Sequence, residues 1–64
     1  MWLENYEVIQ TNTYERTVKN KVVRIFQTTK KVSVHIVDII SQEKLQFLAE
    51  NIEDATKKVE TFIN

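Results

Sequence analysis

The chain has 64 residues, of which 42% are hydrophobic, and nine basic and nine acidic side chains give it a formal net charge of zero. This length allows a single domain over residues 1–64, and the apolar content excludes a disordered chain. Cysteine and glycine are both absent, which excludes disulfides, thiolate metal sites and glycine-rich phosphate loops.

The first part of the chain has the composition of a β-sheet. From Val8 to Ile40, 17 of 33 positions are valine, isoleucine or threonine, whose β-branched side chains suit a pleated sheet. Residues 2–10 and 13–18 read as one long strand or as two, because the sequence at 11–13 allows either a turn or a bulge. We favour a bulge or bend within one long first strand.

Two further strands and their turns follow. Asn20 is expected to adopt the left-handed conformation of a two-residue turn, since asparagine tolerates a positive φ. The next strand covers residues 22–27, and the polar link at residues 28–31 is the hairpin loop. In residues 32–36 valine and isoleucine alternate with serine and histidine, which is the period of a half-buried strand.

The composition changes after Ser41 to glutamate, lysine, glutamine, leucine and alanine, which favour helices. We therefore predict one long amphipathic helix over residues 41–64, with Ser41 as its N-cap. The predicted fold is α+β: a three- to four-stranded antiparallel β-meander packed against one long C-terminal amphipathic helix. The apolar stripe of this helix, at the spacing of 3, 4 and 7, consists of Leu45, Leu48, Ala49, Ile52, Ala55, Val59, Phe62 and Ile63.

A domain of this size buries a small core, and without disulfides or a metal a partner subunit is the remaining source of stability. We therefore expect a homodimer. Phe47 falls off the predicted helical stripe, and Val37 and Ile39 point away from the sheet face that carries Val34 and Ile36. Val37, Ile39 and Phe47 are the candidate interface residues, with scattered surface apolar side chains as the alternative.

No set of residues indicates catalysis or metal binding. His35 is the one imidazole, and a nucleophilic triad or a metal cluster needs more partners than it has. The acidic side chains of Glu50, Glu53 and Asp54 fall on the polar face of the predicted helix. We therefore expect a protein that is not an enzyme, with no cofactor and no small-molecule substrate.

The chain shows no sign of a membrane segment. Its longest apolar runs are three residues long, far shorter than a bilayer requires. Residues 1–4 lack the basic leader and apolar core of a signal peptide. We expect a cytoplasmic protein with no membrane partner.

The charges are segregated along the chain. Residues 16–37 contain six basic residues and no acidic one, whereas residues 1–15 contain three acidic residues and no basic one. A sheet region with this many cations can neutralise several phosphates. Lysines that flank turns also serve as ordinary solubilising residues, so a solvated basic sheet face is the alternative.

The alternation of the central strands suggests which side chains face outward. If Val23 and Ile25 face the helix, Arg24 and Phe26 point to the other side, where a guanidinium and a ring can stack on bases. His35 and Tyr14 are further stacking candidates. The candidate nucleic-acid-binding residues are Arg16, Lys19, Lys21, Arg24, Phe26, Lys30 and Lys31.

Three stretches carry a resemblance to a known family. Residues 14–21 read Y-E-R-T-V-K-N-K, an aromatic strand that leads into a lysine-flanked turn. Residues 22–26 mix apolar, basic and aromatic side chains, and residues 41–55 read as a capped amphipathic helix. Together they resemble the positive cofactor four family of single-stranded-DNA-binding domains. The outline is also similar to the integrase N-terminal domains, which read duplex DNA with a three-stranded sheet.

The resemblance to positive cofactor four implies a dimer whose sheets form a basic, aromatic channel for single strands, lined here by Lys19, Lys21, Arg24 and Phe26. We therefore expect a small non-enzymatic protein that binds single-stranded DNA or RNA as a dimer. The alternative is a small regulatory or inhibitor protein that binds another protein through an edge strand or an apolar patch. The first prediction requires the helix to leave the side of Arg24 and Phe26 uncovered.

Overall fold

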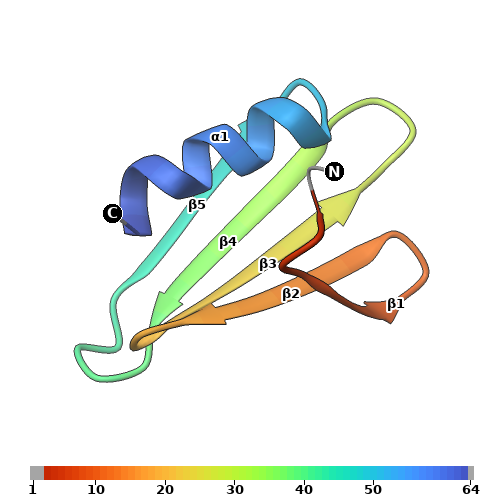
Figure 1. The fold of residues 1–64 in the computed structure, drawn as a ribbon. Helices are drawn as coiled ribbons and strands as arrows, with labels where there is room; N and C mark the ends of the chain where they lie inside the picture. Colours follow the sequence, from red (N-terminus) through yellow and green to blue (C-terminus); the bar gives the residue numbers. More distant parts are fainter. Residues whose placement is uncertain (1–2, 64) are drawn as a thin grey trace.

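The computed structural model describes residues 3–63, which form a five-stranded antiparallel sheet followed by one helix (Figure 1). Each strand pairs with the next one along the chain, so the α+β class and the antiparallel meander are confirmed, with five strands rather than three or four. The elements are β1 (Glu7–Gln10), β2 (Thr13–Val18), β3 (Lys21–Gln27), β4 (Val32–Asp38), β5 (Lys44–Ala49) and α1 (Ile52–Ile63).

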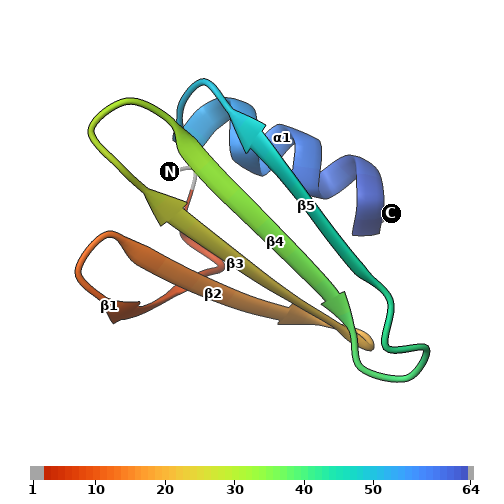
Figure 2. The same cartoon turned by 180° about the vertical axis from the view of Figure 1, so that it is seen from behind.

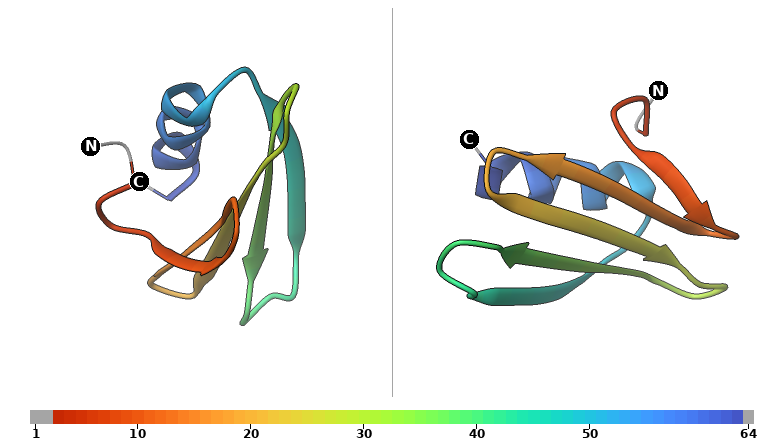
Figure 3. Two further views of the ribbon diagram at one scale, coloured as in Figure 1. Left: turned by 90° about the vertical axis from the view of Figure 1, so that its right-hand side faces the viewer. Right: turned by 90° about the horizontal axis from the view of Figure 1, so that it is seen from below.

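Helix α1 covers one face of the sheet and leaves the other face open. It contacts β3, β4 and β5, and the N-terminal segment lies on the same side as the helix (Figure 3). Seen from behind, the strands have no covering element (Figure 2). We call these sides the covered face and the open face. The core on the covered face consists of Val23, Ile25, Val32, Val34, Ile36, Ala49, Ala55, Val59 and Ile63.

The predicted orientation of the two central strands is confirmed. Val23, Ile25 and Val34 are fully buried beneath α1. Because successive side chains of a strand point to opposite faces, Arg24 and Phe26 lie on the open face. The hydrophobic alternation therefore identified correctly which side of the hairpin packs against the helix.

The prediction of one long first strand is wrong. The chain reverses at residues 11–12, where Asn12 has a φ of 60°, and β1 and β2 are separate strands. The irregularity lies within β1, where the register against β2 shifts between Val8 and Gln10. The predicted start of the strand at Trp2 lies outside the described residues.

The turn between β2 and β3 lies where it was predicted, but Lys19 rather than Asn20 has the positive φ, of 57°. Asn20 instead donates its side-chain amide to Asp38 Oδ1 at 2.8 Å. The same oxygen accepts the backbone N–H groups of Ile40 and Ser41, each at 3.0 Å. One carboxylate therefore ties the turn between β2 and β3 to the turn between β4 and β5.

The prediction of one helix over residues 41–64 is also wrong, because β5 occupies the first part of this range and α1 follows it. The helix start is capped by Asn51 rather than by Ser41. The Oδ1 atom of Asn51 accepts the N–H of Asp54 at 2.8 Å, and Asp54 Oδ2 accepts the N–H of Glu50 at 3.0 Å. This exchange resembles a capping box. It satisfies the N–H of Asp54, which the first helical turn leaves free, and the N–H of Glu50 just before the helix.

The strand conformation of β5 follows from its pairing and its packing. Leu45, Phe47 and Ala49 lie opposite Ile36, Val34 and Val32 of β4, so all three point to the covered face. Leu48 points to the open face and is 58% exposed. A period of two thus replaces the helical period, because ladder hydrogen bonds and burial outweigh the helix propensity of these residues, which is a small energy per residue.

The substitution Asn51→Ala is expected to lower the free energy of unfolding by about 1 kcal/mol, because it removes the N-cap acceptor. Chemical denaturation followed by circular dichroism measures this change. Asn5 is exposed in the N-terminal turn, so Asn5→Ala is the matched control and should change stability by less than about 0.5 kcal/mol. Equal losses in the two variants would show that the cap does not stabilise α1.

Two carboxylates have a lowered pKa in the folded chain, which predicts that the fold is sensitive to acid. The N–H of Glu50 and then Lys58 lower the pKa of Asp54, and the N–H of Ser41 is the largest cause that lowers the pKa of Asp38. A carboxyl with a lowered pKa binds its proton more weakly in the folded chain than in the unfolded one. Its contribution to stability is therefore complete above the unfolded pKa and is lost as the pH falls through the folded pKa.

We expect the thermal midpoint to fall as the pH drops below about 4, near the unfolded pKa of aspartate. The double variant Asp38→Asn, Asp54→Asn should start from a lower midpoint at neutral pH and lose less on acidification. Thermal unfolding scans at a series of pH values measure both curves. If the two curves ran parallel, the acid sensitivity would have to come from other groups.

Candidate nucleic-acid interface

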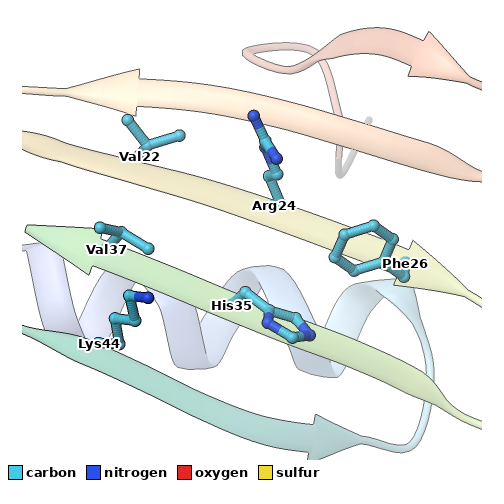
Figure 4. Close-up of a pocket in the computed structure, with 6 residues that line it drawn as sticks. All are labelled: Val22, Arg24, Phe26, His35, Val37 and Lys44. Carbon is cyan, nitrogen blue, oxygen red and sulfur yellow. The ribbon is translucent and has the colours of Figure 1, made fainter.

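The open face has a shallow hollow at its centre, between β3, β4 and β5. Its volume is about 390 Å³. The pairing of the strands explains its composition, since Arg24 lies opposite His35, and Val37 lies between Val22 and Lys44. Directly paired residues share a face of the sheet. The lining residues are Val22, Arg24, Phe26, His35, Val37 and Lys44 (Figure 4).

Two aromatic rings lie together in this hollow. The ring centroids of Phe26 and His35 are 5.0 Å apart and their planes meet at 80°, an edge-to-face arrangement that stabilises aromatic pairs. The His35 Nε2 atom also lies 3.3 Å from the hydroxyl oxygen of Ser33. Both rings are half-buried, so neighbouring side chains hold them in place while part of each remains accessible.

The charges of the open face are graded across the sheet. Arg24 Nε lies 2.8 Å from Glu15 Oε2, and the Arg24 side chain is 53% exposed. Glu7 of β1 lies opposite Glu15 of β2, so the acidic side chains gather at the β1 edge. Among the described residues Lys44 has no carboxylate within 4.0 Å. Positive charge is therefore available on the half of the face formed by β3, β4 and β5.

Arg16, a predicted binding residue, does not lie on the open face. It is paired in register with Val23 and so points to the covered face. There its Nη1 atom lies 2.7 Å from Glu60 Oε1, and its guanidinium lies 5.7 Å from the ring centroid of Tyr6. The hydrogen bond to Glu60 raises the pKa of Arg16. Tyr14 lies opposite Ile25 on the same side, so its prediction as an outward stacking residue is wrong.

The four predicted lysines lie near the ends of the strands rather than in the hollow. Lys19 is in the turn between β2 and β3, and Lys21, at the start of β3, lies 3.7 Å from Asp38. Lys30 and Lys31 are in the loop between β3 and β4. The expected continuous basic face is therefore not formed, and of the seven predicted residues only Arg24 and Phe26 line the hollow.

The segregation of charge along the sequence disappears in space. Four of the six cations of residues 16–37 form ion pairs with acidic residues from outside that range. The chain thus brings distant carboxylates to its basic segment, which lowers the local positive potential. The pairs are Arg16–Glu60, Lys21–Asp38, Arg24–Glu15 and Lys31–Glu50.

The three predicted interface residues lie in different places. Val37 is half-buried on the open face, as its predicted orientation requires. Ile39 lies beyond the end of β4 and is 58% exposed. Phe47 does not lie on a helix; it points from β5 to the covered face, where its ring centroid is 5.4 Å from that of Phe62.

Three residues of the site were not among the predicted binding residues. Lys44 falls within the predicted long helix, and its place on the open face follows only once β5 is a strand paired with β4. Val22 and Val37 supply the apolar floor beside it. The alternation of Leu45, Phe47 and Ala49 was the sequence signal that could have placed Lys44 correctly.

Together the fold and the site define a small α+β domain with an uncovered sheet face that carries aromatic and cationic side chains. Within residues 3–63 no three His, Cys, Asp or Glu side chains are placed to hold a metal ion, and no helix is long and apolar enough to cross a bilayer. No protein-family model, curated protein or solved structure matches the chain. The open face is therefore the feature of the chain that bears on its function.

Proposed function

We propose that this protein is a small non-enzymatic module that binds single-stranded nucleic acid, DNA or RNA, on its open face and acts as a homodimer. The observation that supports this function is the grouping of Phe26 and His35 with Arg24 and Lys44 on a face without a cover. Proteins that bind single strands combine aromatic side chains for base stacking with cations for the backbone. Sheets that present aromatic residues are a recurrent solution for RNA.

The arrangement suggests a path for the strand. Bases would stack on Phe26 and His35, and phosphates would lie near Arg24 and Lys44. The carboxylates of Glu7 and Glu15 would repel a phosphate backbone from the β1 side of the face. The bound strand should therefore follow β3, β4 and β5 rather than cross the whole sheet.

Titration of a labelled single-stranded oligonucleotide at two salt concentrations tests this function. If Arg24 and Lys44 of one chain neutralise two phosphates, affinity should fall roughly 7-fold between 50 and 200 mM salt, from a slope of about −0.7 per phosphate. The proposal fails if no binding is detected at low salt, or if the affinity does not depend on salt.

Substitution of the stacking ring gives a larger effect. Phe26→Ala should weaken binding by roughly 5- to 150-fold, the equivalent of about 1–3 kcal/mol of base stacking. Circular dichroism must show that the variant remains folded. If Phe26→Ala bound as tightly as the unchanged chain, the aromatic pair would have no part in binding.

A matched pair of lysine variants tests the charge. Lys44→Ala removes a cation from the hollow. Lys57→Ala removes an exposed cation from α1, on the opposite side of the sheet from the hollow. Only the first should reduce the affinity and the salt slope, because a phosphate contact contributes to both. Equal effects would indicate attraction to overall charge without a defined site.

A protein-binding regulator is the second candidate function. Leu45, Leu48 and Phe62, near the β5 edge, are 40%, 58% and 48% exposed, and exposed apolar groups at a strand edge suit another polypeptide. A pulldown that returned one dominant protein after nuclease treatment, from a chain that bound no oligonucleotide, would favour this function over the first.

A further inference from the structure

The two edges of the sheet are built differently. Strand β1 has four residues, begins with Glu7, and has a register shift between Val8 and Gln10. Strand β5 has six residues, pairs with β4 in an unbroken register, and has Lys44 as its only charged residue. Short length, bulges and charge protect an edge from pairing with another chain. Edge β1 has all three protections, whereas β5 has only the single charge at its first residue.

Apolar side chains gather beside the unprotected edge. Leu45, Phe47, Leu48 and Phe62, which we call the edge patch, line a hollow of about 370 Å³ next to Lys58 and Thr61. Three of the four are at least 40% exposed. Free backbone groups and apolar side chains are thus available at one place, and strand addition uses both.

We infer that a second copy of this chain pairs antiparallel with β5 about a two-fold axis perpendicular to the sheet. In such an isologous contact the same surface serves both subunits. Rotation about this axis does not exchange the two faces of the sheet. An odd-numbered residue of β5 therefore pairs with an odd-numbered residue of the second copy's β5. The apolar row of Leu45, Phe47 and Ala49 on the covered face therefore meets its own copy.

Charge complementarity selects one register among those that the symmetry allows. With Phe47 on the axis, Lys44 lies opposite the partner subunit's Glu50, and Glu50 lies opposite the partner subunit's Lys44. The Glu50 side chain lies 3.6 Å from Lys31 of its own chain but is 76% exposed, so its carboxylate remains accessible to a partner. This register joins opposite charges at both ends of the contact and leaves apolar side chains between them.

The pairing extends the open face, and this part of the inference rests on the proposed function. The two β5 strands would form the seam, with both copies of β3 and β4 beside it and both copies of β1 at the outer edges. The aromatic and cationic side chains of both subunits then form one central strip. Glu7 and Glu15 of each copy are kept at the periphery.

Light scattering during size-exclusion chromatography of the full chain tests the pairing. We expect a particle of twice the chain mass of 7.6 kDa. Lys44→Glu or Glu50→Lys alone places like charges opposite each other at both ends and should weaken the dimer by roughly 10-fold or more. The double variant Lys44→Glu, Glu50→Lys restores opposite charges and should restore the dimer.

Lys57→Glu is the control, because this exposed lysine lies on α1 and should leave the dimer unchanged. Circular dichroism of every variant verifies the fold. A monomer at all concentrations, or a dimer that neither single charge reversal weakens, would overturn the inference. A dimer weakened by either reversal but not restored by the double variant would also overturn the proposed register.

Oligonucleotide binding separates this inference from the proposed function. A strip built from two copies offers four cations, and affinity should then fall roughly 50-fold between 50 and 200 mM salt. A dimer that responds to the charge reversals but binds no oligonucleotide would support the pairing and refute the function. A monomer that binds with the shallower slope of one face would support the binding of single strands but refute both the pairing and the homodimer.

Discussion

The substitution Ile25→Ala is expected to lower the free energy of unfolding by about 3–4 kcal/mol, within the range for large-to-small changes in a core. Ile25 is fully buried in β3 beneath α1. Its backbone is held on both sides, since it pairs with Tyr14 of β2 and Val34 of β4. The strand therefore cannot move to fill the cavity that the substitution leaves. The loss of stability then includes both the transfer free energy of the removed atoms and the cost of the cavity.

A loss of this size is comparable to the whole stability expected for a chain of 64 residues, which is about 3–10 kcal/mol. The variant should be largely unfolded at room temperature or unfold at a much lower urea concentration by circular dichroism. Ile40→Ala is the control, because Ile40 is 78% exposed and its truncation should cost less than about 0.5 kcal/mol. Similar midpoints for the two variants would mean that Ile25 is not a central core residue.

The central hairpin of β3 and β4 could be predicted because the sequence pattern that defines it lies within a few neighbouring residues. Val32, Val34 and Ile36 alternate with polar residues, and a period of two defines both the strand and its two faces. The polar link that precedes Val32 marks the loop. The same alternation placed Arg24 and Phe26 on the uncovered side, so this half of the candidate site followed from the sequence.

The boundary between β5 and α1 could not be found in the same way. The chain has no glycine and no proline, the residues that usually mark the end of an element. Five of the six residues of β5 are leucine, glutamine, lysine or alanine, which form helices readily. Pairing with β4 decides the conformation, and that contact lies outside any local window of sequence. Asn51 was the one available signal of a helix start, as an N-cap with Asp54 three residues later.

The predicted basic face is larger than the observed one for a different reason. The order of charges along a chain does not say which carboxylates fold back onto the cations, and Glu60 lies 44 residues from its partner Arg16. The face of Arg16 was nevertheless deducible, because the two-residue turn at Lys19 and Asn20 aligns Arg16 with Val23. The hairpin register, together with the alternation within each strand, puts Arg16 on the covered side with Val23.

Two truncations in β5 distinguish the strand from the predicted helix. The strand and the helix predict opposite orders for the two losses in the free energy of unfolding. Phe47→Ala removes a ring that packs against Phe62 on the covered face, and we expect a loss of about 2–3 kcal/mol, less than for a fully buried phenylalanine. Leu48→Ala truncates a side chain that is 58% exposed on the open face, and we expect a loss below about 0.5 kcal/mol. On a long helix Leu48 would belong to the buried stripe and Phe47 would not, so the order of the two losses would be reversed.

The measurement is urea denaturation of both variants in the Lys44→Glu background, at low chain concentration, so that association through β5 does not contribute to either value. The comparison is informative because the two residues are neighbours with large apolar side chains, and they differ mainly in the face to which they point. Phe47 restrains both α1 and the edge strand, so its loss should also raise hydrogen exchange in β5 before the rest of the sheet. A greater loss for Leu48→Ala than for Phe47→Ala would contradict the strand assignment, and with it the position of Lys44 on the open face and the edge on which the paired assembly depends.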